Sequence, residues 1–303
     1  MKKKLFSLVL IVSLMANSGF VKANAEVIEN NQAVEWFDER MQDYEPYQEK
    51  LEEYPEMENV QASISYILIE DSIDKKGNVI DTNQEVFDNL DDMNAYEEEK
   101  LESNNIKPFV VNPGDIVYKT YSKMKVGLAL YKYTSSRFFV SYTYEWLTLP
   151  SPGAISTNKI RAVVGLALNP QLSIDSSTYD GRVSYTTDWV QGTQFGQTSY
   201  MKNVSNGGIT IKPSGTQGIG YSFSVPHYTG ANFNIVTSMS GNISCTAFKS
   251  NTNDNYCSAL GSYADVTTTL SLDSFSVSIP AGISFGAATS YSSYNLQDSL
   301  YIK

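Results

Sequence analysis

The chain has 303 residues and a formal net charge of −11, and it contains one histidine and two cysteines. The excess of acid argues against nucleic acids and anionic membrane surfaces as partners, because both are negatively charged. The shortage of histidine and cysteine argues against the common zinc sites, which need more ligands of these types.

The first residues predict an export signal. Lys2, Lys3 and Lys4 precede an apolar run, Leu5 to Met15, and Ala23-Asn24-Ala25 is a cleavage signal. The apolar run is shorter than the roughly 20 residues of a membrane-spanning helix. We therefore predict a secretory signal peptide over residues 1–25, cleaved near Ala25, and a secreted, extracellular protein with no integral membrane segment after cleavage. That compartment permits disulfides.

Acidic residues are concentrated after the signal peptide. Residues 26–105 hold 24 of the 33 acidic residues and five basic ones, whereas residues 106–303 hold nine acidic and thirteen basic ones. So abrupt a change indicates a boundary near residue 105. We predict an acidic, α-rich segment over 26–105 with one short hairpin. Its acid is interpreted as a solvated helix face, with a pro-segment or lid docked on the basic part, or a tether in the cell wall, as alternatives.

Within this segment the apolar spacing changes twice. Apolar residues recur every three or four positions from Val34 to Tyr54, which predicts a helix. We expect Pro46 to kink or split this helix. Val60 to Glu70 is typical of a strand. Thr82 with Glu85 fits a capping box, which predicts a second helix running from there to about Glu102.

Alternation with a period of two dominates from residue 106 onward. Val126 to Leu130 and Phe138 to Trp146 flank the turn Thr134-Ser135-Ser136 and predict a hairpin. A Gly- and Gln-rich connection follows Trp189, and Asn206-Gly207-Gly208 is a second hairpin signal. The other predicted strands cover 162–168, 183–189, 221–225, 233–245 and 275–285. So many short strands predict an antiparallel β-sandwich, or a barrel-like closure, over 106–303.

The two cysteines lie on either side of a run of turn-forming residues. If Ser250 to Asn255 closes a hairpin, Cys245 faces Cys257 on the buried side of a sheet. Neighbouring residues in that position are close enough for a disulfide. We therefore predict a Cys245–Cys257 disulfide, with two free buried thiols as the alternative. Half of a metal site is a third interpretation, but the spacing supplies no further ligands.

Catalytic motifs are scarce. His227 would have to serve any Ser-His-Asp triad, no nucleophile elbow is present, and His227 follows Pro226 in what we predict to be an exposed loop. We predict no catalytic residues, no metal site and no cofactor. Glu145 beside Trp146 resembles the acid-and-aromatic arrangement of sugar sites. With Trp189 these two residues are the binding candidates, although Glu145 alternates outward as a surface residue would.

The overall layout resembles that of secreted proteins of Gram-positive bacteria. The features behind this resemblance are the lysine-rich signal, the acidic helical lead-in and the Tyr/Ser-rich part that contains Tyr144-Glu145-Trp146-Leu147. It implies a bacterial extracellular protein and assigns no functional residue.

Three functions follow as hypotheses. The first is a non-enzymatic binding or interaction module whose partner is an extracellular protein or glycan, since Tyr, Ser, Asn and Gly form adaptable binding surfaces. The second is a β-pore-forming toxin, because Ser262 to Ser278 is amphipathic, although its phase slips between Leu272 and Phe275 and Asp265 and Asp273 interrupt it. The third is a hydrolase that uses two carboxylates on a glycan.

Overall fold

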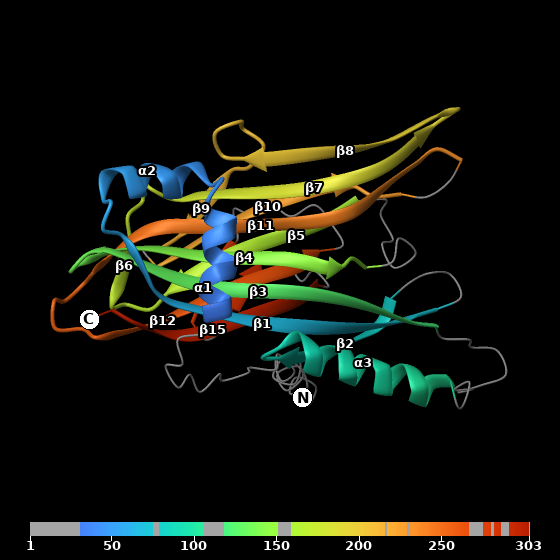
Figure 1. Ribbon diagram of the computed structural model, residues 1–303, viewed down its shortest axis with the longest axis horizontal. Coiled ribbons are helices and arrows are strands. Elements are labelled where there is room, and N and C mark those ends of the chain that lie inside the picture. The colour runs from blue at the N-terminus through green and yellow to red at the C-terminus, as the bar shows by residue number, and fades with distance from the viewer. Residues whose placement is uncertain are drawn as a thin grey trace, which may run out of the picture.

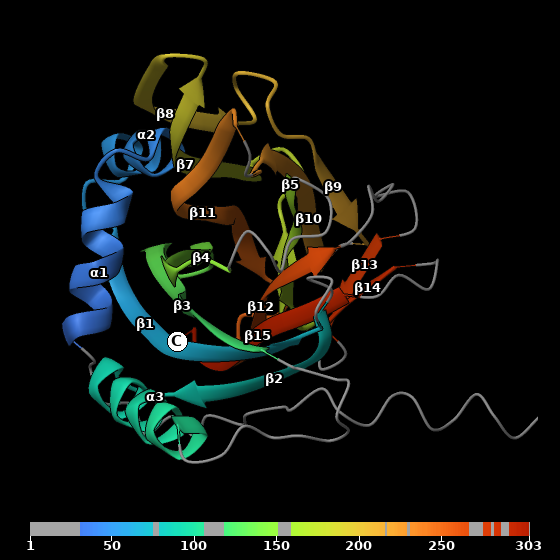
Figure 2. The same cartoon turned by 90° about the vertical axis from the view of Figure 1, so that its right-hand side faces the viewer.

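The protein consists of two large antiparallel sheets packed face to face, with helices on the outer face of one of them (Figures 1 and 2). The computed structural model describes residues 31–74, 79–105, 118–150, 159–215, 217–228, 231–266, 275–279, 282–285 and 291–302. The predicted mainly-β fold, with a helix-containing acidic lead-in, is confirmed. The predicted signal peptide lies outside the described residues.

Sheet A has eight strands in the order β2-β1-β3-β4-β11-β7-β8, with β6 also paired to β11. Neighbouring strands are antiparallel throughout, and β1 pairs with β3 from Glu58 to Ile73. The acidic segment thus contributes two strands to this sheet. Its strands are β1 (Glu58–Ile73), β2 (Val79–Phe87), β3 (Tyr118–Thr134), β4 (Arg137–Thr148), β6 (Leu172–Ile174), β7 (Asp180–Gln191), β8 (Gln194–Asn203) and β11 (Phe233–Lys249).

Sheet B has five strands in the order β15-β12-β5-β10-β9. At one corner the side chain of Gln61 joins the two sheets: its amide donates to the Ser299 carbonyl (3.0 Å) and accepts from the Tyr301 amide (2.8 Å). The strands of sheet B are β5 (Lys159–Leu168), β9 (Ile211–Ser214), β10 (Gly218–Pro226), β12 (Tyr256–Val266) and β15 (Tyr291–Tyr301). A separate hairpin consists of β13 (Phe275–Ser278) and β14 (Gly282–Phe285).

The core between the sheets is unusually rich in tyrosine. Tyr142, Tyr144, Tyr221 and Tyr263 are all fully buried there. Glycines of the opposite sheet make room for two of these rings: a Cβ at Gly181 would overlap Tyr221, and one at Gly261 would overlap Tyr142. Within sheet A, a Cβ at Gly241 would overlap Tyr144 of the neighbouring strand. Close ring-to-backbone packing of this kind fixes the spacing of the two sheets.

A second core lies between the outer face of sheet A and the helices α1 (Asn31–Met41) and α2 (Glu45–Glu53). Phe37 and Met41 from α1 pack with Tyr131 and Phe139 from the sheet, and all four are at most 1% exposed. The predicted effect of Pro46 is confirmed, because the helix is split and the proline stands in the first turn of α2.

The predicted capping box at Thr82 is wrong. Residues Val79–Phe87 form β2, whose backbone pairs with β1, and helix α3 begins only at Leu90 and runs to Asn105. Thr82 donates to Asp71 on β1 (2.7 Å) instead of capping a helix. Strand pairing with β1 outweighs the local helix signal.

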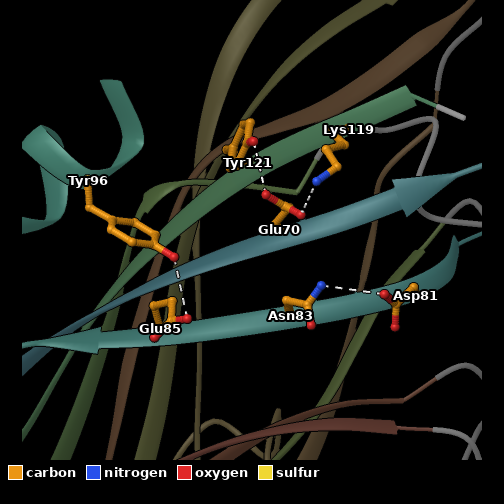
Figure 3. Close-up of polar contacts among 7 residues, drawn as sticks. All are labelled: Glu70, Asp81, Asn83, Glu85, Tyr96, Lys119 and Tyr121. Carbon is orange, nitrogen blue, oxygen red and sulfur yellow. Dashed lines mark hydrogen bonds and ion pairs between the residues drawn. The ribbon is translucent and has the colours of Figure 1, made fainter. Parts of the chain in front are cut away.

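Polar contacts hold α3, β2 and the neighbouring strands together (Figure 3). Glu70 on β1 accepts from the Lys119 ammonium (2.6 Å) and the Tyr121 hydroxyl (3.0 Å) of β3, while Tyr96 of α3 donates to Glu85 of β2 (3.4 Å). Of these two carboxylates of the acidic segment, Glu85 is exposed and Glu70 is half-buried.

The predicted disulfide is wrong: Cys245 and Cys257 are both free, and both are buried. Their strands do not form a hairpin. Cys245 on β11 lies opposite Val140 of sheet A, and Cys257 on β12 lies opposite Leu300 of sheet B. The turn residues between them carry the chain from one sheet to the other. Burial raises the pKa of both thiols, that of Cys257 to about 12, so both are protonated at neutral pH.

Two further predictions, the connection after Trp189 and the hairpin at Asn206-Gly207-Gly208, are wrong. The Gly- and Gln-rich connection after Trp189 is the strand β8, joined to β7 by a tight turn with Gly192 at φ 61°. Conversely, Asn206-Gly207-Gly208 does not close a hairpin, since it leads from β8 in sheet A to β9 in sheet B. The hairpin of β3 and β4 is as predicted, with Leu130 opposite Val140.

Candidate functional site

A shallow groove of about 290 Å³ lies on the outer face of sheet A, over β4, β7, β8 and β11. Figure 1 shows α1 crossing this sheet, with β7, β8 and β11 extending past the helix. The groove is lined by Glu145, Trp146, Ser184, Tyr185, Thr186, Ser199, Tyr200, Ser238, Met239 and Ser240.

The strand register places small hydroxyl residues side by side in the groove. Ser240 lies opposite both Glu145 and Ser184, and Thr186 lies opposite both Ser238 and Ser199. Residues directly opposite one another share a face of the sheet, so all six are on the outer face. The groove is therefore walled by hydroxyl groups with one carboxylate at its end.

Three of these hydroxyls have no partner among the residues that the structure describes. Thr186 and Ser199 share a hydrogen bond of 3.1 Å, but those of Ser184, Ser238 and Ser240 make none with the described residues. All three are half-exposed or exposed. Since each hydroxyl can both donate and accept, the groove offers several hydrogen bonds to a bound molecule.

A bulge in β11 shapes one end of the groove. The pairing of β11 with β7 shifts between Val236 and Ser238, and the buried His227 accepts a hydrogen bond from the Val236 amide at Nδ1 (2.9 Å). A bulge bends its strand and increases the local twist. The prediction of an exposed His227 is wrong, because this side chain is 1% exposed. Burial lowers the pKa of its imidazole, which keeps it neutral at pH 7.

Glu145 is held in place from helix α1. Its carboxylate forms an ion pair with Arg40 at 2.5 Å and accepts from the Trp36 indole at 3.4 Å. The Arg40 guanidinium lies over the Trp36 ring, 5.3 Å from its centroid. Its charge thus balanced, Glu145 is suited to accept hydrogen bonds in a fixed orientation rather than to act as a free acid.

A buried lysine reinforces this end of the groove. Lys125 is 8% exposed, and its ammonium lies 4.4 Å from the centroid of the Trp36 ring and 5.5 Å from that of Tyr66. Burial lowers the pKa of Lys125, an effect that the nearby Glu145 carboxylate opposes. Two cations on Trp36 therefore fix the indole that donates to Glu145.

Two of the three predicted binding residues, Glu145 and Trp146, line the groove. Glu145 is half-exposed there, whereas Trp146 belongs to the core and is 5% exposed. Trp189 is half-exposed on β7, where it covers Gly196 of β8 and donates to Thr198 (3.0 Å). The hydroxyl residues of β7, β8 and β11 were missed as a site, since serine and threonine on the polar face of a strand carry no distinctive signal.

The part of the chain that the structure describes brings no three metal-binding side chains together. Of the residues that line the groove, Glu145 is the one carboxylate. Within the same described ranges, no helix has the length and apolar character needed to cross a bilayer.

No protein-family model and no curated protein sequence matches the chain. Among solved structures it is similar to Clostridium perfringens delta-toxin, with 11% identity over 60% of this chain and 85% of that one, and a TM-score of 0.31. The collagen-binding domain of a Staphylococcus aureus adhesin (10% identity, 54% and 87%, TM-score 0.26) and the T6 backbone pilin of Streptococcus pyogenes (11%, 79% and 64%, 0.28) also match. At these scores the neighbours do not indicate a function, which we argue from the site.

Proposed function

We propose that this protein is a secreted, non-enzymatic binding module whose groove over β4, β7, β8 and β11 holds a hydroxyl-rich ligand, a short stretch of extracellular glycan. The observation that carries this proposal is the set of hydroxyls of Ser184, Ser238 and Ser240, which have no partner among the described residues and stand beside the oriented carboxylate of Glu145. Sugars are recognised by such arrays of donors and acceptors.

The size and charge of the groove support the same ligand class. A volume of about 290 Å³ is at the lower end of small-molecule sites and suits one or two sugar rings. The carboxylate is paired with Arg40, so the groove presents little net charge to a ligand. A neutral sugar is therefore a better fit than a phosphate or a polycation.

A binding role also fits the number of acids in the groove better than hydrolysis does. Glycosidases place two carboxyl groups on either side of the bond that they cleave. The residues that line this groove include one carboxylate, and its charge is engaged by Arg40 and Trp36. The arrangement therefore supports binding without cleavage.

The test is a glycan array followed by titration calorimetry with the oligosaccharides that bind. Ser199→Trp fills the groove and is expected to weaken binding at least tenfold. Ser299→Trp, at an exposed serine on β15 of the other sheet, is the matched control and should bind like the wild type. Equal binding by both variants would exclude the groove as the site, and release of reducing sugar by the wild type would favour a hydrolase.

A further inference from the structure

Strand β8 forms one edge of sheet A and pairs on one side only, with β7. It is ten residues long and lies at the upper margin of the molecule in Figure 1. From Gln194 to Met201 it contains no charged residue and no proline. The edge of a sheet presents a row of backbone amides and carbonyls with which another strand can pair.

The edges formed by β2 and β9 differ from β8 in features that disfavour such pairing. β2, at the other edge of sheet A, exposes the carboxylates of Asp81 and Glu85. β9, at an edge of sheet B, is four residues long and contains Pro213. Charges, proline and short length are the means by which proteins keep strand edges unpaired. The stretch from Gln194 to Met201 has none of them.

The turn after β8 shows which backbone groups of this strand point away from β7. The side chain of Asn206 donates to the Met201 carbonyl (3.2 Å) and accepts from the Asn203 amide (3.1 Å). Backbone groups of every second residue point to the same side of a strand, so those of the odd-numbered residues from 195 to 199 point outward too. None of the residues that the structure describes bonds to these outward groups. The open part of the edge thus comprises three alternate residues.

Large apolar side chains surround this open edge. Phe195 is 83% exposed, and Met201 and Tyr200 are 51% and 44% exposed. Phe195 and Met201 share the outer face of the sheet with Ser199, because these residues alternate along the strand. Burying a ring as exposed as that of Phe195 against another protein surface would stabilise an association.

The distribution of charge favours a second copy of this chain as the partner. Helix α3, six of whose sixteen residues are acidic, packs on β1 and β2, and Figure 1 shows it at the opposite margin of the molecule from β8. Several strand widths of about 4.8 Å therefore separate α3 from β8. Charges farther apart than about 8 Å are largely screened at physiological ionic strength. Two copies that meet through β8 thus keep their most acidic helices apart.

We propose that β8 pairs antiparallel with β8 of a second copy, so that the two A sheets join in a symmetric dimer. Pairing Phe195 with Ser199 of the second copy, and Gln197 with Gln197, uses every open backbone group of both strands. Each pair exchanges two hydrogen bonds, and the twofold axis passes between the two Gln197 residues. A symmetric contact of this kind closes on itself, so assembly stops at the dimer.

The dimer also brings an aromatic ring to the groove, a consequence that rests on the proposed glycan-binding function. Ser199 lines the groove, and directly opposite residues in a sheet have Cβ atoms about 4.5 to 5.5 Å apart. Phe195 of the second copy therefore stands beside Ser199 on the outer face. It adds an apolar surface to a site that otherwise offers mostly hydroxyls to a sugar.

Sedimentation velocity over a dilution series in the micromolar range tests the dimer. Gln197 donates to Asp188 of β7 (2.8 Å), so Gln197→Glu gathers four carboxylates around the twofold axis and should raise the dissociation constant at least about tenfold. Gln84→Glu, the same change at an exposed residue of β2, is the matched control and should dimerise like the wild type. A monomeric wild type, or a Gln197→Glu dimer as tight as that of the wild type, would overturn the proposal.

Crosslinking tests the register independently. Gln197→Cys places two thiols directly opposite each other, within reach of a short bismaleimide, while the buried Cys245 and Cys257 stay unreactive in the folded protein. A covalent dimer is expected on a denaturing gel for this variant and not for the control Gln84→Cys. Equal crosslinking of the two variants, or none in either, would contradict the proposed pairing.

Glycan titration of Gln197→Glu separates this proposal from that of the groove. The monomeric variant keeps the residues that line its groove, so it should still bind, but more weakly than the wild type because Phe195 of the second copy is lost. Unchanged binding would remove the contribution of Phe195 and leave the groove in place. Loss of the dimer in the wild type, with binding retained, would refute the pairing alone.

Discussion

The outer face of sheet A has two halves that the same strands cross, and they differ in what covers them. Under α1 and α2, β4 presents Phe139, which is 1% exposed; further along, it presents the half-exposed Glu145. On β11 the corresponding change is from Ser244, buried under Tyr44, to the exposed Ser238. Covered positions contribute to stability, while uncovered ones remain available for a ligand.

The two halves should differ most in how a substitution changes the free energy of unfolding, and the largest loss is expected from Phe139→Ala in the covered half. The change leaves a cavity between α2 and the sheet, and large-to-small substitutions of this kind cost about 3–5 kcal/mol of unfolding free energy. Urea unfolding measures it. Ser240→Ala, in the uncovered half, should change the same quantity by no more than about 0.5 kcal/mol. Equal losses would show that the two halves do not differ as described.

A smaller loss of stability is expected when the pH is lowered, because His227, which supports the uncovered half, becomes protonated. Burial lowers the folded-state pKa of His227, so the unfolded chain binds a proton first as the pH falls below about 6.5. The stability that neutral His227 contributes is complete above that pH and is lost as the pH falls toward the lowered folded-state value. Protonation of Nδ1 would also remove the hydrogen bond from Val236.

Urea unfolding at pH 7 and pH 5 of the wild type and of His227→Gln isolates this contribution. Carboxylates titrate in both proteins, so the difference between the two pH dependences belongs to position 227. We expect the variant to lose less stability between the two pH values than the wild type does. An identical loss would mean that His227 keeps its ordinary pKa in the folded protein.

The smallest effect on stability is expected from Glu145→Gln, at the border between the two halves. Both partners of the Arg40–Glu145 pair are more than a quarter exposed, and such pairs contribute about 0 to 1 kcal/mol. A double-mutant cycle with Arg40→Met measures the coupling through urea unfolding. The same variant should bind the glycan ligand more weakly, and a coupling above about 2 kcal/mol would show that Glu145 serves stability first.

The period-two pattern predicted most of the strands because each has one buried face. The hairpin of β3 and β4 follows directly from the alternation of Val126 to Leu130 and Phe138 to Trp146. A turn signal, however, does not say whether the next strand stays in the same sheet. The loop after Lys249 carries the chain to sheet B, and for this reason Cys245 and Cys257 face different neighbours.

Long-range pairing also explains the other differences. Thr82 and Glu85 satisfy a local helix signal, but the backbone of β2 pairs with β1 along the stretch from Tyr66 to Ile73. The edge strand β8 looks like a loop because its glycine and glutamines lack strand propensity, and Trp189 covers Gly196 from the neighbouring strand. Of the residues that line the candidate site, Glu145 and Trp146 were predicted from the sequence. The other members become a group only through the register of four strands.

The amide side chain of Gln61 has a consequence for how these molecules meet one another. It occupies the carbonyl of Ser299 and the amide of Tyr301, two of the positions where a foreign strand would have to attach to β15. The Gln61 side chain thereby satisfies backbone groups that a further strand would otherwise pair with. This protects the edge strand β15 of sheet B against edge-to-edge aggregation.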